Sequence, residues 1–264
     1  MRAIQLAAGS SALAASLYLW RRHLLRAARL DARGFLAVKS AATPHAVAEM
    51  CAAIEAEAAK VEGGGYIIWT PAENLPGPCR KWAAEQASAI LQRSLPPGTP
   101  AVRLLGGAAL WKRASVDDPT PWHQDFAYQS ATGFATSRKV RHAAVWLALS
   151  PTDSRSGCLR FAPKLGYSCL EHTTLPRAQA PSGFETHMTG GCVADAEANA
   201  EDCALEAGSA VIIGDQVVHG SHACVQGERS RLAFSPLFEV DCADCPLPAG
   251  KRETLASYLL GLLR

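Results

Sequence analysis

The pattern of apolar positions between residues 34 and 98 predicts a short strand followed by two helices. The strand covers residues 34–38. The first helix begins at Thr43-Pro44 and continues to about residue 61, because apolar residues recur there at the three- and four-residue spacing of one helix face. That apolar face consists of Val47, Met50, Cys51 and Ile54. The second helix runs from about residue 80 to residue 95 and ends at Pro96-Pro97-Gly98.

Beyond Pro100 the pattern changes to short apolar runs separated by Gly, Pro, Ser and Asp. These runs predict strands at residues 102–112, 122–128, 140–149, 157–162, 209–214, 217–224 and 229–240. Residues 164–205 lack clear periodicity, so we expect a long insertion between strands, of the kind that often serves as a functional lid. A closing helix is expected at residues 257–264. The spacing is typical of a sandwich or jelly roll, which predicts a mainly β fold with flanking helices.

Composition narrows the class of protein. The chain has 264 residues, of which 48% are hydrophobic and 19% charged, so it can bury a sizeable core in one large domain or two small ones. The net charge of +2, with no long basic block, argues against a dedicated nucleic-acid binder. Nine cysteines without a regular framework argue against a disulfide-stapled secreted domain, which favours an intracellular location.

The N-terminal segment differs from the rest of the chain. Residues 1–30 hold five arginines and no acidic residue, and the Ala/Leu/Ser run at 3–20 is barely long enough to span a bilayer. Three interpretations stay open: an organelle transit peptide, a weak anchor that contacts a membrane, or an ordinary helix of the domain. The folded domain is therefore placed at residues 31–264.

A candidate metal site lies in Pro121-Trp122-His123-Gln124-Asp125. On a strand, residues i and i+2 project from one face, so His123 and Asp125 are placed to bind one ion. His219, in a β-branched run after a turn, supplies a second imidazole. Two histidines and one carboxylate form the facial triad of non-haem Fe(II) oxygenases. The alternatives are a surface His–Asp pair and, for His219, a histidine of the core.

A candidate anion-binding arginine follows His219. Residues 217–225 and 229–240 predict a hairpin joined by Gln226-Gly227-Glu228. A three-residue turn would place Arg231 opposite Ala223, on the face of His219 and Ser221 and roughly 13 Å along the strand from His219. A guanidinium group suits a dicarboxylate, because its fork matches a carboxylate. A two-residue turn would put Arg231 on the other face, and Arg229 remains a rival.

Three blocks in this order resemble the phytanoyl-CoA dioxygenase-like branch of the Fe(II)/2-oxoglutarate dioxygenases, over roughly residues 33–240. The first block is Leu110-Trp111-Lys112 with residues 120–125. The second is Val145-Trp146-Leu147-Ala148-Leu149 with residues 156–163. The third is His219-Gly220-Ser221 with Arg231-Leu232-Ala233. The resemblance implies a double-stranded β-helix, a cupin-like jelly roll with helices packed outside.

The resemblance also implies a set of site residues and a reaction. It implies His123, Asp125 and His219 as Fe(II) ligands and Arg231 as the salt-bridge partner of 2-oxoglutarate. Further co-substrate contacts are implied for Lys112, Trp146 and Ser221. In the implied reaction, O₂ and 2-oxoglutarate are consumed, succinate and CO₂ are released, and a C–H bond of a small-molecule, acyl or lipid substrate is hydroxylated, with ascorbate as a reductant. Related halogenases carry a small residue in place of Asp125, so this carboxylate favours hydroxylation.

The sequence departs from the family pattern in three places. Pro163-Lys164-Leu165-Gly166 replaces the usual Pro-Gly-Ser-His, one extra residue separates His219 from Arg231, and His222-Ala223-Cys224 replaces a polar stretch. Two other functions stay open: a metal-dependent hydrolase or isomerase on the same scaffold, and an inactive binding module. The lone Cys242-Ala243-Asp244-Cys245 is expected to be incidental, because no second pair accompanies it.

Overall fold

The computed structural model describes residues 21, 23–30, 32–59, 66–69, 71–113, 119–127, 140–165, 170–175, 186–225 and 230–241. The strands are β1 (Phe35–Val38), β2 (Tyr66–Trp69), β3 (Arg103–Lys112), β4 (Thr120–His123), β5 (Val140–Ala148), β6 (Leu159–Phe161), β7 (His172–Thr174), β8 (Thr186–Met188), β9 (Glu201–Cys203), β10 (Ala210–Gly214), β11 (His219–Ser221) and β12 (Arg231–Asp241). The helices are α2 (Pro44–Ala58), α3 (Gly77–Trp82), a π-helical turn (Ala83–Ala87), α4 (Ser88–Gln92) and α6 (Gly191–Ala198), with 3-10 turns at Ala72–Asn74 and Pro163–Leu165.

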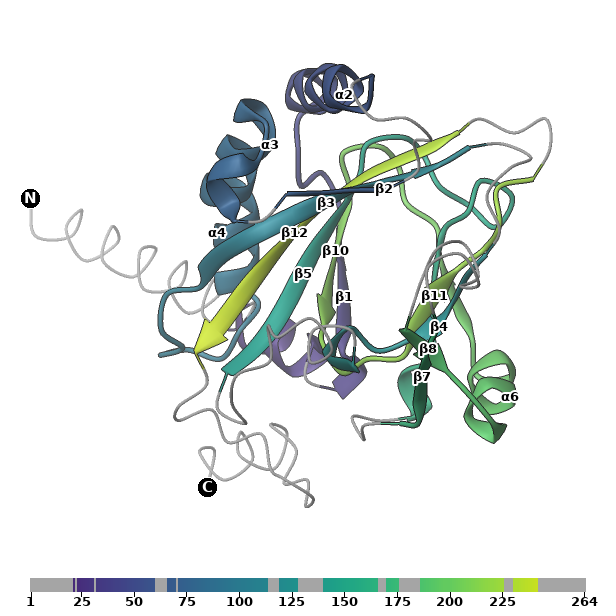
Figure 1. Cartoon of the computed structure of the whole chain (residues 1–264). Helices are drawn as coiled ribbons and strands as arrows, with labels where there is room; N and C mark the ends of the chain where they lie inside the picture. Colours follow the sequence, from purple (N-terminus) through teal and green to yellow (C-terminus); the bar gives the residue numbers. More distant parts are fainter. Residues whose placement is uncertain are drawn as a thin grey trace, which may run out of the picture.

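The strands form two facing antiparallel sheets. The larger sheet has the order β1-β10-β5-β12-β3-β2, the smaller sheet has the order β4-β11-β6-β9, and β7 pairs with β8. Helices α2, α3 and α4 lie on one side of the larger sheet, and the smaller sheet lies on the other (Figure 1). The expected mainly β jelly roll with flanking helices is confirmed.

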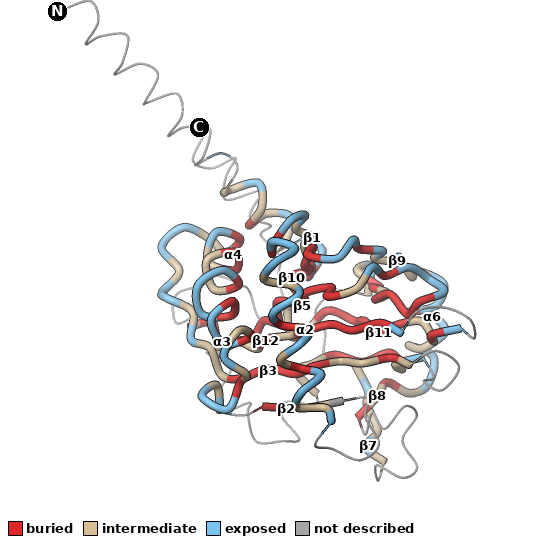
Figure 2. The backbone as a smooth tube through the Cα atoms, turned by 90° about the horizontal axis from the view of Figure 1, so that it is seen from above, coloured by how far each residue is buried: buried red, intermediate tan, exposed pale blue. Residues whose placement is uncertain are grey.

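Alternation along the central strands builds two cores. On β5, Val145 and Leu147 join the core under the helices, together with Met50 and Trp82. Ala144 and Trp146 face the other way and belong to the core between the sheets, where the Phe35 and Phe161 rings stack at 3.9 Å between centroids. Because the larger sheet is covered on both faces, its central strands β5 and β10 are buried along most of their length, whereas the helices keep one exposed face (Figure 2).

The two predicted helices are present with small shifts in their ends. Thr43 caps α2, since its hydroxyl oxygen accepts a hydrogen bond from the Ala46 N–H at 3.2 Å, and Pro44 occupies the first turn. The second helix runs without a break from residue 77 to residue 92 through the π turn, so it starts slightly before the expected residue 80.

Two expectations were wrong: the length of the strand at residues 122–128 and the irregular insertion at residues 164–205. Strand β4 ends at His123, not residue 128, because residues 125–127 fold into a helical turn. Residues 164–205 are not an irregular insertion: they contain β7, β8, α6 and β9, and β9 pairs with β6 as an integral strand of the smaller sheet. Three-residue strands offer too few positions for an alternating pattern to register in the sequence.

The predicted hairpin was also wrong. Strand β11 pairs with β4 and β6 in the smaller sheet, whereas β12 pairs with β3 and β5 in the larger one. Arg231 therefore faces Lys112 rather than Ala223. Two successive apolar runs look alike whether the chain turns back within one sheet or crosses to the facing sheet, and here it crosses. The expected turn at 226–228, Arg229, the lone Cys-x-x-Cys and the closing helix all lie outside the described residues.

Only part of the N-terminal segment is described. Residues 23–30 are helical, Ala27 is buried, and the His23 Nε2 atom lies 2.7 Å from the Leu95 carbonyl oxygen. Within the described ranges, no helix combines the length and the apolar character needed to cross a bilayer. Residues 1–20 lie outside those ranges, so the three interpretations of this segment and the domain boundary at residue 31 stay predictions.

Candidate metal centre

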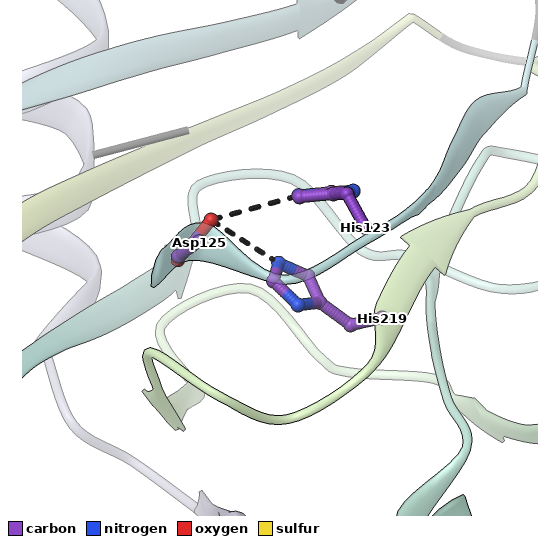
Figure 3. A group of neighbouring side chains, drawn as sticks. All are labelled: His123, Asp125 and His219. Atoms are coloured by element: carbon purple, nitrogen blue, oxygen red, sulfur yellow. Dashed lines mark ion pairs between the residues drawn. The ribbon is translucent and has the colours of Figure 1, made fainter. Parts of the chain in front are cut away.

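Three side chains from two strand ends meet at one point of the smaller sheet. His123 ends β4 and His219 begins β11, and the two are direct cross-strand partners with ring centroids 4.1 Å apart. The Asp125 carboxylate oxygen Oδ1 lies 3.6 Å from the Nε2 atom of His123 and 3.7 Å from that of His219 (Figure 3). One ligand atom of each residue lies within 4.8 Å of the others, a spacing suited to one metal ion.

Backbone carbonyl groups orient both imidazole rings. The Nδ1 atom of His123 lies 2.8 Å from the Pro121 carbonyl oxygen, and that of His219 lies 3.0 Å from the Val217 carbonyl oxygen. A carbonyl oxygen only accepts, so each Nδ1–H donates and each Nε2 keeps its lone pair toward Asp125. This is the tautomer in which histidine binds a metal.

The electrostatic state of the three groups also suits a cation. Burial, assisted by the neighbouring His123, lowers the pKa of His219 to about 4. For Asp125, burial alone would raise the pKa, but the electrostatic influence of His219 and His123 outweighs it and leaves the pKa below its usual value. The site therefore offers two imidazoles whose Nε2 atoms face one carboxylate, the donor set of the facial triad of non-haem iron.

Asp125 does not lie on a strand, although its two-residue spacing from His123 had predicted one. It lies in the helical turn after β4, where the Phe126 N–H donates to the Asp215 carbonyl oxygen at 2.8 Å and the Ala127 N–H donates to that of Gln124 at 3.0 Å. The turn, rather than strand alternation, brings the carboxylate beside the two rings.

Gln124 is a positioning residue that the sequence did not reveal. Its side chain is 1% exposed, and its Nε2 atom donates to the Gln216 carbonyl oxygen at 2.6 Å. Its Oε1 atom accepts from the Leu170 N–H at 2.9 Å, and its backbone N–H donates to His172 Nε2 at 3.1 Å. Gln124 thus ties the end of β4 to the turn before His219 and to the segment before β7. Its partners are far away in sequence, so no local pattern indicates this role.

The residues expected to hold a dicarboxylate gather on the inner face of the larger sheet. Arg231 and Lys112 are direct cross-strand partners, 4% and 5% exposed, and the Arg231 guanidinium carbon lies 5.3 Å from the centre of the Trp146 ring. The buried Trp146 N–H has no hydrogen-bond partner among the described residues. Ser221 lies on the facing β11, where its hydroxyl donates to that of Thr120 at 2.8 Å.

Comparison with known families decides the relationship. Residues 30–232 match the family described as phytanoyl-CoA dioxygenase (PhyH). The chain belongs to the phytanoyl-CoA dioxygenase family. The resemblance inferred from the three sequence blocks is therefore confirmed. No curated protein matches the sequence significantly.

Solved structures with the same fold include enzymes of several reaction types. EvdO2 from Micromonospora carbonacea var. aurantiaca is 20% identical with a TM-score of 0.63, over 84% of this chain and 92% of EvdO2. The non-heme alpha ketoglutarate dependent epimerase SnoN from nogalamycin biosynthesis is 19% identical with a TM-score of 0.58, over 90% and 93% of the two chains. The carbocyclase SnoK is 20% identical with a TM-score of 0.57, over 81% and 83%. At these identities the likeness shows the fold.

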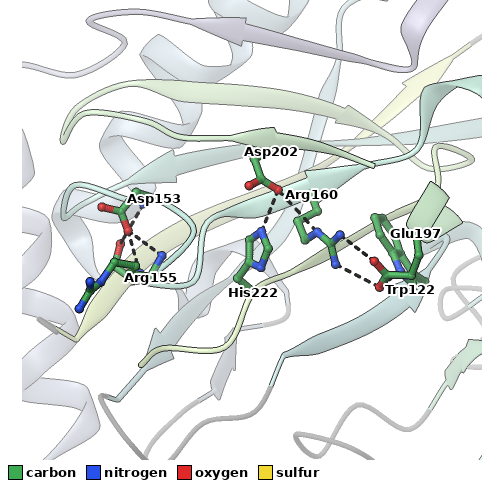
Figure 4. Close-up of polar contacts among 8 residues, drawn as sticks. Trp122, Asp153, Arg155, Arg160, Glu197, Asp202 and His222 are labelled. Carbon is green, nitrogen blue, oxygen red and sulfur yellow. Dashed lines mark hydrogen bonds and ion pairs between the residues drawn. The ribbon is translucent and has the colours of Figure 1, made fainter. Parts of the chain in front are cut away.

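A second group of ligand-type side chains lies on the outer face of the smaller sheet of this family member. Atoms of Cys158, Asp202 and His222 lie within 4.8 Å of one another. However, burial raises the pKa of the Cys158 thiol to about 12, and the Arg160 guanidinium lies 3.6 Å from the Asp202 carboxylate (Figure 4). A protonated thiol and a neighbouring cation both disfavour a bound divalent ion.

The outer group instead belongs to a network of ion pairs. His222 Nε2 lies 2.7 Å from the Asp202 carboxylate, and Arg160 donates two hydrogen bonds to Glu197 at 3.1 and 2.7 Å (Figure 4). Glu197 also accepts from the Trp122 N–H at 2.8 Å. Glu197 lies on α6, so the network attaches this helix to the back of the strands that carry the metal centre.

Proposed function

We propose that the protein is an Fe(II)- and 2-oxoglutarate-dependent dioxygenase that hydroxylates a C–H bond of a small-molecule substrate. One oxygen atom of O₂ enters the substrate, whose C–H bond becomes C–OH. The other oxygen atom enters succinate, which is formed together with CO₂ from 2-oxoglutarate. The observation that carries the proposal is the meeting of two imidazoles and one carboxylate inside a phytanoyl-CoA dioxygenase-family fold. His123, Asp125 and His219 would hold the metal, and bound Fe(II) supplies the activation of O₂.

The second part of the proposal concerns the co-substrate. We assign Arg231 to the distal carboxylate of 2-oxoglutarate, with Lys112, Trp146 and Ser221 as further contacts. Two buried cationic groups side by side on an otherwise apolar face suit an anionic guest. A charge-assisted pair is also stronger where water is excluded.

A second candidate reaction breaks the same C–H bond without inserting oxygen. The fold is shared with the epimerase SnoN and the carbocyclase SnoK, which are named for stereochemical inversion and ring formation. Isotopically labelled O₂ separates the two reactions, because only a hydroxylase transfers one labelled atom to the organic product in addition to the atom in succinate.

The first experiment is an anaerobic titration of the full chain with Fe(II) and 2-oxoglutarate, monitored by the weak visible charge-transfer band of the chelate. We expect a band in the wild type and none in Asp125→Ala. Arg231→Ala should weaken 2-oxoglutarate binding about ten- to a hundredfold, because it removes hydrogen bonds between charged groups. Folded, metal-loaded wild-type protein without a band would refute the proposal and favour a metal enzyme of another class.

A further inference from the structure

The inner face of the larger sheet has two polar ends. Strand pairing places Arg231 and Lys112 at one end of this face, and Glu239 with its cross-strand partners His142 and Arg103 at the other. Eight residues of β12 separate Arg231 from Glu239, about 26 Å along the strand. The first end is the one proposed to hold 2-oxoglutarate, and the second has no role in binding that molecule.

At the second end, the inner face of β12 is more exposed than its outer face. On β12, the inward residues Ser235, Leu237 and Glu239 are partly exposed, whereas the outward Phe234 and Phe238 are fully buried under the helices. The inner residues nearest to these are small: Gly106, Ala108 and Ala144. Among the described residues, this part of the inner face therefore presents small or partly exposed side chains rather than large buried ones.

His142 is a buried imidazole on the same inner face, directly across from Glu239. Only 4% of the residue is exposed, and the ring forms no hydrogen bond to any residue within the described ranges. Burial lowers the pKa of His142, so the ring is uncharged at neutral pH.

Asp215 connects His142 to the helical turn that carries Asp125. The Asp215 carboxylate accepts a hydrogen bond from the His142 N–H at 3.2 Å, and the Asp215 N–H donates to the His142 carbonyl oxygen at 3.2 Å. The Asp215 carbonyl oxygen accepts from Phe126, the residue after Asp125. His142 is thus held in a fixed position relative to the metal centre.

Glu239 supplies a carboxylate beside the imidazole. It forms an ion pair with Arg103, and 25% of its side chain stays exposed. An uncharged imidazole both donates and accepts hydrogen bonds, whereas a carboxylate only accepts. A hydroxyl group matches this pair, because it donates to the carboxylate while it accepts from the imidazole. Because Glu239 already balances the charge of Arg103, the pair offers no net positive charge to a carboxylate or phosphate on the guest.

We propose that His142 and Glu239 form the substrate subsite of this enzyme and select an uncharged substrate that bears a hydroxyl group. The inference rests on the proposed function and narrows its substrate class. It makes both residues specificity determinants of the reaction rather than ligands of the metal or of 2-oxoglutarate.

The test compares three probes that share one ring: cyclohexanol, cyclohexanecarboxylate and cyclohexylammonium. Each is titrated anaerobically into the Fe(II) and 2-oxoglutarate complex, and its binding is measured by the change in the chelate band. In the wild type, cyclohexanol should bind about tenfold more tightly than cyclohexanecarboxylate. His142→Ala should weaken cyclohexanol binding about tenfold through the lost hydrogen bond. His45→Ala, an exposed position on α2, is the matched control and should change neither value.

Glu239→Gln keeps the test decisive if His142→Ala does not fold. It removes one charge at nearly constant shape, so it should weaken cyclohexanol binding and strengthen cyclohexanecarboxylate binding, and a purely structural role would not change this ratio. The subsite would be overturned if Glu239→Gln left the ratio of cyclohexanol to cyclohexanecarboxylate affinity unchanged. It would also be overturned if the wild-type band did not respond to cyclohexanol, or if cyclohexylammonium bound more tightly than cyclohexanol. Absence of the band itself in the wild type would instead refute the proposed function.

Discussion

At the scale of single residues, the geometry of the candidate metal centre depends on side chains that touch no metal. Gln124 stands between two ligand candidates in sequence, yet its side chain turns away from them and bonds to Gln216 and to Leu170. A fully buried amide with both ends satisfied is costly to replace, because its partners become unpaired.

We expect Gln124→Leu to lower the free energy of unfolding by about 1–3 kcal/mol, since two partly buried backbone groups lose their partner. Metal affinity should fall about tenfold or more, because the turn before His219 is no longer held. Thermal unfolding and a metal titration measure the two effects. Gln86→Leu makes the same substitution at an exposed position and should change neither. Equal metal affinity in Gln124→Leu and the wild type would refute the positioning role.

At the scale of elements, close backbone approaches attach the helices to the sheets. Gly208, in the turn before β10, has a φ of +81°, and a Cβ atom there would lie 2.7 Å from the Ala42 carbonyl oxygen. The Gly208 carbonyl oxygen accepts a hydrogen bond from the Ala42 N–H at 2.9 Å, just ahead of α2. This contact sets where α2 begins against the larger sheet.

Gly208→Ala should destabilise the protein by about 2–4 kcal/mol, because it combines backbone strain with a clash against a fixed carbonyl group. Gly98→Ala is the control: its φ is +84°, but no atom lies within 4 Å of the added Cβ, so only the strain, about 1 kcal/mol, is expected. Urea unfolding midpoints give both values. Equal losses in the two variants would show that the approach to Ala42 is unimportant.

The attachment of α6 to the smaller sheet should depend on pH. The hydrogen bonds from Arg160 hold the pKa of Glu197 below its usual value. A depressed pKa in the folded state means that the ion pair stabilises the protein above the unfolded-state pKa and loses this effect as the pH falls through the folded-state value. We expect wild type to exceed Glu197→Gln in stability at neutral pH by a small amount, and this difference to vanish under acidic conditions.

Denaturant unfolding at a series of pH values measures the difference between the two proteins. The control is Gln86→Leu, an exposed position in the π turn without a titrating group, whose stability difference from wild type should stay flat across the series. A difference for Glu197→Gln that grows as the pH falls would contradict a depressed pKa at this carboxylate.

At the scale of the whole molecule, the proposed ligands would join the two sheets. The metal-ligand candidates come from the smaller sheet and the turn after it, whereas Arg231 and Lys112 come from the larger sheet. A 2-oxoglutarate molecule bound to both groups therefore adds a direct link between the two layers.

Mn(II) and 2-oxoglutarate together should raise the thermal unfolding temperature by more than Mn(II) alone. Each ligand supplied at about 100 times its Kd adds about 2.7 kcal/mol to the folded state. Arg231→Ala should retain the increment from the metal and lose most of the increment from 2-oxoglutarate. Asp125→Ala should lose both. Full retention of the 2-oxoglutarate increment in Arg231→Ala would assign the co-substrate to another cation.

Local patterns predicted much of this architecture. Apolar runs between turn residues identified β3, β5, β10 and β12, because each strand has five or more residues, and the Thr43-Pro44 cap marked the start of α2. The juxtaposition of His123, Asp125 and His219 was expected from their spacing and from the family resemblance. The sequence could not show that β11 and β12 lie in different sheets, because the choice between turning back and crossing over depends on the packing of the facing layers.

The site residues missed by the sequence share one property. The partners of Gln124, His142 and Asp215 lie 46 to 92 positions away along the chain. Neither periodicity nor a short motif records such contacts. They become visible only when the turn before His219, the end of β4 and the start of β5 are seen together.

The helical turn that carries Asp125 has a consequence for redesign. This carboxylate lies beyond the last paired residue of β4, so its exchange breaks no hydrogen bond between strands. The candidate ligand Asp125 can therefore be exchanged without changing the strand pairing. A chemist who shortens this one side chain leaves both sheets intact and creates a vacancy that a small exogenous anion, such as formate, can fill.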